Sequence, residues 1–136
     1  MHLWRTVYDP KVRGLHHRAA RGFGHALLSP LVSRVFQILG VAAAIHEHKD
    51  NWVLLNPGPN FTGLEIEHGA DKHRYAYNER QLAVARETRK LVRGEHRGYI
   101  DFFAPIVAGK TSVGTLVCGP VASADPKPKE LLENWH

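Results

Sequence analysis

The sequence predicts an α+β fold in which an antiparallel β-sheet is flanked by helices. Two pairs of short apolar segments, each joined by a brief polar or glycine-bearing turn, have the pattern of β-hairpins. One segment with helical character precedes the first pair, and another separates the two pairs. Strands joined as hairpins are antiparallel and need no crossover helix, so a doubly wound parallel sheet is disfavoured.

The first helix is predicted from "SPLVSRVFQILG", residues 29–40. Ser29 is a suitable N-cap, Pro30 suits the first helical position, and Gly40 can end the helix. One face carries apolar side chains that we expect to lie on the sheet, namely Leu31, Val32, Val35, Phe36 and Leu39. The first hairpin follows in "VAAAIHEH" and "WVLLN", which are separated by "KDN". The prolines of "PGPN" then predict a loop.

The middle of the chain has weaker signals. "FTGLEIEHG", residues 61–69, alternates apolar and polar side chains and predicts a strand or an extended loop. "DKHRYAY", residues 71–77, shows no clear period and is predicted as a polar loop rich in aromatic residues. A second helix is predicted over residues 78–94, because Asn78 and Gln81 approximate a capping box and Gly94 can end the helix.

The second hairpin is predicted from residues 99–107 and 112–118, with "AGKT" between them. Gly109 supplies the permissive backbone that a tight turn requires. Gly114 interrupts the second strand, which indicates a bulge or the close approach of another backbone or of a ligand. Pro105 lacks a backbone donor, so we expect it at a sheet edge or at a bulge.

Composition and charge restrict the class of protein. A chain of 136 residues with 43% hydrophobic residues predicts a single globular domain. No apolar run approaches the roughly 20 residues that cross a bilayer, and no secretory signal begins the chain, so we expect a cytoplasmic protein. The one cysteine, Cys118, excludes an internal disulfide and a thiolate-rich zinc site.

Basic charge is concentrated at one end. Residues 1–30 carry +4 of the formal net charge of +5. Such a basic arm could contact nucleic acid or acidic lipid, or pack on a partner subunit. The interleaving of aromatic and basic residues that is typical of RNA-binding proteins is absent, so nucleic acid is an unlikely partner.

The second hairpin carries a family resemblance. "YIDFFAPIVAGKTSVGTLVCGPV" resembles the terminal hairpin of GAF-type sensory domains, and more closely that of GAF/PAS-like sensory domains of the PocR type. In the PocR type a Cys-His-x-Gly-Leu-x-Asp element precedes the hairpin. "EHRGYID" matches this element at His96, Gly98 and Asp101, with Tyr99 in place of the leucine. "VAAAIHEHKDNWVLL" resembles the strand-turn-strand that opens the same fold.

This resemblance implies a non-enzymatic sensory input domain of a bacterial signalling or transcription-regulatory protein. It implies a small organic ligand, no cofactor, a homodimer and a downstream output module. The domain would cover residues 31–122, preceded by the basic arm or helix of residues 1–30 and followed by a linker and the start of a helix in residues 123–136. Thr62 and Glu95 stand where the family often has cysteines, so no thiolate-based role is carried over.

A pocket between the sheet and the segments that cover it is expected to hold the ligand. The side chains predicted to lie near it are Trp52, Phe61, His73, Tyr75, Tyr77, His96, Tyr99, Asp101 and Phe103. For Trp52, Phe61 and Phe103 the simpler interpretation is that they fill the core. His96 and Asp101 could read the ligand as a pair in which the carboxylate fixes the imidazole tautomer. Alternatively, Asp101 caps a loop and His96 is solvated.

The competing hypothesis is a small metal-dependent enzyme. The histidines that suit a three-histidine zinc site are His46, His48 and either His68 or His73. Glu95 or Asp101 would then act in an open cleft. No nucleophile elbow, P-loop or His-Glu-x-x-His motif is present, and Cys118 lies in an apolar strand where a thiol is normally inert. A third hypothesis is a nucleic-acid-associated module that uses the basic arm.

Overall fold

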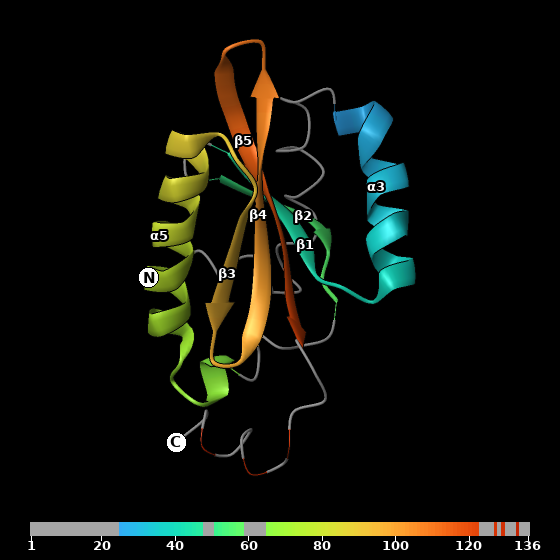
Figure 1. Cartoon of the computed structure of the whole chain (residues 1–136). Coiled ribbons are helices and arrows are strands. Elements are labelled where there is room, and N and C mark those ends of the chain that lie inside the picture. The colour runs from blue at the N-terminus through green and yellow to red at the C-terminus, as the bar shows by residue number, and fades with distance from the viewer. Residues whose placement is uncertain are drawn as a thin grey trace.

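The computed structural model describes residues 25–47, 51–58 and 65–122, together with the isolated positions 127, 129 and 133. Its elements are α3 (His25–Leu39), β1 (Ala43–Glu47), β2 (Asn51–Asn56), α5 (Asp71–Thr88), β3 (Val92–His96), β4 (Tyr99–Ala108) and β5 (Thr111–Ala122). The strands form one sheet in the order β2-β1-β5-β4-β3, and all neighbouring strands are antiparallel. Figure 1 shows α5 and α3 on opposite sides of this sheet. The predicted α+β fold is therefore confirmed.

The first helix starts earlier than the sequence predicts. α3 begins at His25, so Pro30 lies inside the helix and not at its first position. Proline removes one backbone hydrogen bond from a helix, and α3 continues through Pro30 despite this loss. The predicted end at Gly40 is confirmed, since Gly40 has a φ of +66° and its N–H donates to the carbonyl oxygen of Gln37.

The apolar face of α3 does not lie on the sheet as predicted. Leu31, Val35 and Leu39 are 67%, 46% and 63% exposed, whereas Val32 and Phe36 are half-buried. The contacts of α3 with the sheet are made to β2, the edge strand. Because an edge strand offers little surface for a helix to pack on, most of the predicted apolar face of α3 is exposed to solvent.

The second helix also starts earlier, at Asp71, and it ends at Thr88. Residues 71–77 are thus its first two turns, and the predictions of a loop there and of a cap at Asn78 are wrong. The side chains that α5 buries follow a helical spacing but include polar ones: Arg74, Tyr77, Asn78, Leu82 and Ala85. A search for apolar periodicity misses such a stripe. Residues 65–67 form a helical turn and not the predicted strand or extended loop.

The strand β3 was predicted as the end of a helix. It pairs with β4 from Val92 opposite Phe103 to His96 opposite Tyr99. Gly94 lies opposite Asp101 within this pairing and faces α5. A Cβ atom at Gly94 would collide with the Tyr77 hydroxyl, so this strand position requires a glycine.

The β4–β5 hairpin has the predicted form. Gly109 turns the chain with a φ of +62°. Pro105 lies beyond the end of β3, which pairs with residues 99–103, so its missing N–H interrupts no ladder on that side. The register between β4 and β5 shifts after the pair formed by Ile106 and Gly114, which confirms the predicted bulge.

The core lies between α5 and the sheet. Six buried side chains form it, namely Ala44, Trp52, Tyr77, Leu82, Ala85 and Phe103. Because Phe103 and Val117 face each other across β4 and β5, the central strands supply the floor of this core and α5 covers it (Figure 1). Within the described ranges, no helix combines the length and the apolar character needed to span a bilayer.

Candidate functional site

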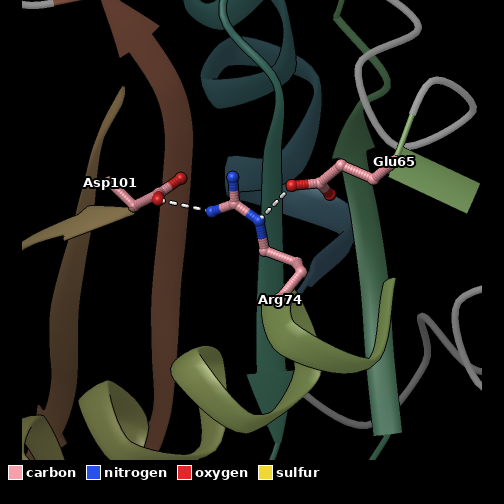
Figure 2. Close-up of polar contacts among 3 residues, drawn as sticks. All are labelled: Glu65, Arg74 and Asp101. Carbon is pink, nitrogen blue, oxygen red and sulfur yellow. Dashed lines mark hydrogen bonds and ion pairs between the residues drawn. The ribbon is translucent and has the colours of Figure 1, made fainter. Parts of the chain in front are cut away.

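A buried arginine joins three elements on the α5 side of the sheet. The Nε atom of Arg74 donates to Glu65 Oε1 at 2.7 Å, and its Nη1 atom donates to Asp101 Oδ2 at 2.6 Å. All three side chains are at most 7% exposed. Figure 2 shows the guanidinium of Arg74, from α5, between Asp101 of β4 and Glu65 of the turn before α5.

The three charges depend on one another. Burial raises the pKa of Glu65 and of Asp101, although the charge of Arg74 opposes the rise in both. Burial alone would lower the pKa of Arg74, but the charges of Asp101 and Glu65 raise it. The guanidinium therefore stays charged and holds two carboxylates that would otherwise be unfavourable at this depth.

A glycine lies beside Asp101 on each neighbouring strand, and the one on β5 makes room for its carboxylate. Gly94 is its partner on β3, and the register of β5 shifts opposite Asp101. A Cβ atom at Gly119 of β5 would lie 2.6 Å from Asp101 Oδ1. At the second carboxylate of the cluster, the Ala70 N–H donates to the Glu65 carbonyl oxygen at 2.8 Å, and this hydrogen bond fixes the turn that carries the Glu65 side chain.

A stacked pair of neutral rings lies next to this ion-pair cluster. The rings of Tyr77 and His96 stack with centroids 4.9 Å apart, and Tyr77 also meets Phe103 edge-on. His96 Nε2 is buried without a hydrogen-bond partner, whereas the buried Tyr77 hydroxyl lies beside the Asp101 carboxylate, to which it can donate. Burial, followed by the charge of Arg74 and those of Arg97, His73 and Arg80, lowers the pKa of His96 to about 4.

Both rings are consequently neutral near pH 7. Burial and, secondly, the charge of Asp101 raise the pKa of Tyr77. A neutral imidazole has one donor and one acceptor nitrogen, and a phenol can donate or accept. The pair therefore offers two uncharged hydrogen-bonding atoms on an aromatic surface.

The structure brings together part of the predicted site. Trp52, Tyr77 and Phe103 lie in the core, as the simpler interpretation of Trp52 and Phe103 expected. His96 lies on Tyr77, and the half-buried Tyr99 is its partner across the β3–β4 turn.

Other predicted residues lie elsewhere. His73 and Tyr75 are on the exposed surface of α5, and Phe61 lies outside the described residues. The predicted pairing of His96 with Asp101 is not formed, because the Asp101 carboxylate accepts from Arg74 and His96 Nε2 has no partner. The side chain that Asp101 orients is an arginine from the helix.

Sequence reasoning missed Arg74 and Glu65. A signal for Arg74 existed: once a helix is started at Asp71, Arg74 falls three residues before Tyr77 and eight before Leu82, on the buried stripe. A charged residue in such a stripe requires a buried partner. Glu65 carried no comparable signal, since its segment alternates like a strand.

The histidines of the metal hypothesis are spread apart where they can be placed. His46 is buried edge-on against Trp52, with ring centroids 4.7 Å apart, whereas His68 and His73 are exposed. His48 lies outside the described residues. In the part of the chain that the structure describes, no three histidine, cysteine, aspartate or glutamate side chains gather in a metal-ligand arrangement.

Replacing Arg74 tests the ion-pair cluster. We expect Arg74→Met to lower the free energy of unfolding by about 3–5 kcal/mol, because two buried carboxylates lose their counter-charge. Urea denaturation measures the change. Adding Glu65→Gln and Asp101→Asn to the Met variant should restore part of the loss. An unchanged urea midpoint in Arg74→Met would contradict the cluster.

The pKa of His96 predicts a pH dependence. Because its folded-state value is about 4 and its ordinary value is 6.5, the unfolded chain binds the proton more readily, and stability should fall as the pH drops from 6.5 to 4. Glu65 and Asp101 act in the opposite direction, since their raised pKa values favour folding at low pH. His96→Phe keeps a ring on Tyr77 without the titration, so the difference in unfolding free energy between wild type and variant isolates His96. A difference independent of pH would contradict the assignment.

Comparison with known proteins identifies the family. The family model described as the sensory domain found in PocR matches residues 25–136, which is more than half of the chain. No curated protein and no solved structure matches the chain. The matched region contains α3, the whole sheet, α5 and the cluster around Arg74. The chain therefore belongs to the family of sensory domains found in PocR.

Proposed function

We propose that this sensory domain binds a small organic ligand beside the Tyr77–His96 pair and does not catalyse a reaction. The observation that carries the proposal is that a buried polar atom, His96 Nε2, lacks a hydrogen-bond partner beside an aromatic ring that also carries a hydroxyl. A buried polar group without a partner costs about 1–3 kcal/mol. A ligand that bonds to His96 Nε2 would recover this energy on binding.

The charged groups nearby have a different role. Arg74 already bonds to Glu65 and Asp101, so in this proposal the three charged groups hold the site in place. The neutral Tyr77–His96 pair forms the hydrogen bonds to the ligand. The Arg74 guanidinium carbon lies 5.4 Å from the centroid of the Tyr77 ring. A ligand that shifts Tyr77 would therefore move Arg74, and with it the ion pairs to β4 and to the turn before α5.

This route connects the ligand to an output. The turn of residues 65–67 and the start of α5 would carry the change to an output module of a cytoplasmic signalling or transcription-regulatory protein. A non-enzymatic role is supported by the family and by Cys118, whose thiol pKa is raised by burial and then by the charge of Asp101. An activated thiol nucleophile has the opposite shift.

A homodimer is part of the same proposal. Leu31, Val35 and Ile38 are 67%, 46% and 73% exposed and recur at helical spacing on α3, which suits the same face of a second copy. The sequence also has apolar residues near both ends of the chain that would suit a dimer interface, and these lie outside the described residues: Leu3, Trp4, Val7, Leu131, Leu132 and Trp135. Sedimentation should show a dimer that Ile38→Glu dissociates. A monomeric wild type at high protein concentration would contradict it.

Ligand binding can be tested without knowing the ligand. Native mass spectrometry of untreated protein should show a co-purified small molecule, and a thermal-shift screen of alcohols, diols, amides, carboxylates and aromatic compounds should supply ligands for titration. We expect His96→Ala and Tyr77→Phe each to weaken binding roughly threefold to tenfold, the value of one hydrogen bond.

Tyr75→Phe is the matched control, because Tyr75 lies on the exposed surface of the same helix. Its affinity should equal that of the wild type. If Tyr75→Phe weakens binding while Tyr77→Phe and His96→Ala do not, the ligand binds on the outer surface of α5 and the proposed site is wrong.

A further inference from the structure

Basic side chains surround the stacked pair. On α5, His73 lies four residues before Tyr77 and Arg80 three residues after it, so both flank the ring that His96 covers. Arg97 follows His96 directly in the β3–β4 turn. The charges that act most strongly on His96 are those of Arg74, Arg97, His73 and Arg80, and all four are basic.

Two buried acidic groups on the same side of the sheet already bond to Arg74. Asp101 and Glu65 each accept a hydrogen bond from Arg74 at 2.6–2.7 Å. Besides burial, the charge of Asp101 and, more weakly, that of Glu95 raise the pKa of Tyr77. Neither charge is among the main influences on the pKa of His96. The surroundings of the two atoms therefore differ: they are basic at the unpartnered His96 Nε2, whereas the Tyr77 hydroxyl has the Asp101 carboxylate beside it.

We propose, on the basis of the ligand site proposed above, that the ligand is a small organic carboxylate whose anionic end accepts a hydrogen bond from His96 Nε2–H. Arg80 and Arg97 favour its charge, and the uncharged part of the ligand lies toward the Tyr77 hydroxyl. A hydrogen bond to a charged acceptor is about twice as strong as one between neutral groups. His96 is only half-buried, so a small displacement of its ring opens Nε2 to the ligand.

The proposal predicts a change at His96 itself. An anion bound to Nε2 favours the imidazolium, so it should raise the pKa of His96 from about 4 toward its ordinary value of 6.5. Affinity should correspondingly increase as the pH falls from 6.5, for as long as the ligand carboxylate stays ionised. NMR of the histidine side chains, with His96→Phe to assign the signal, follows the titration directly.

The experiment uses three probes with the same three-carbon chain, namely propanoate, propanamide and propylammonium, each at the same ionic strength set with sodium chloride. Propanoate should bind tightest and raise the pKa of His96, and propylammonium should bind weakest. Arg97→Asn should weaken propanoate binding about threefold to tenfold, because one nearby charge contributes roughly a kcal/mol. Asparagine tolerates the left-handed backbone of this position, where φ is +53°.

Arg89→Asn is the matched control, because Arg89 also has a positive φ, of +55°. It is the C-cap of α5, at the opposite end of the helix from His73. Equal losses in the two variants would indicate a general charge effect and overturn the proposal. Propanamide binding at His96 as tightly as propanoate would overturn the carboxylate class while leaving the ligand site intact. If none of the probes changes the NMR signal of His96, the carboxylate proposal is wrong. Native mass spectrometry and the thermal-shift screen test the proposed ligand site independently of this result.

Discussion

The structure depends on one buried guanidinium. Arg74 lies between two carboxylates from different parts of the chain, and each of the three groups would be unfavourable at this depth without the others. This arrangement explains features that local sequence does not. Gly94 and Gly119 leave space around Tyr77 and Asp101, β5 shifts register opposite Asp101, and the turn at Glu65 packs against the start of α5.

The polar groups on the α5 side of the sheet fall into two sets. In the first, around Arg74, the two charged hydrogen bonds fasten α5 to the sheet and to the preceding turn. In the second, Tyr77 and His96 are neutral, stacked and incompletely bonded. Polar groups whose hydrogen bonds are complete stabilise the fold. Buried polar groups that lack a partner in the folded protein are suited to binding a ligand, because the ligand can supply the missing hydrogen bond. The cation–π contact of Arg74 with Tyr77 joins the two sets.

This division accords with membership of a sensory-domain family. A sensor must respond to a ligand without unfolding, so the groups that read the ligand should differ from those that hold the domain together. In this domain Arg74 of the first set and Tyr77 of the second lie on the same helix, α5. The opposite side of the sheet differs again, since α3 packs at the β2 edge and keeps an apolar stripe in solvent.

The sequence by itself determined the α+β class, the two hairpins, and the roles of Gly109, Pro105 and Gly114, because these follow from backbone chemistry within a few residues. It also carried the resemblance in "EHRGYID" that the family match bears out. Only the tertiary structure decided that residues 71–77 are helical, that residues 92–96 form a strand, and that Arg74 is buried. The partners of Arg74 lie 9 and 27 residues away in the chain. Helical spacing from Asp71 can put Arg74 on the buried stripe, but burial of a charged side chain depends on such distant partners, and no local pattern identifies them.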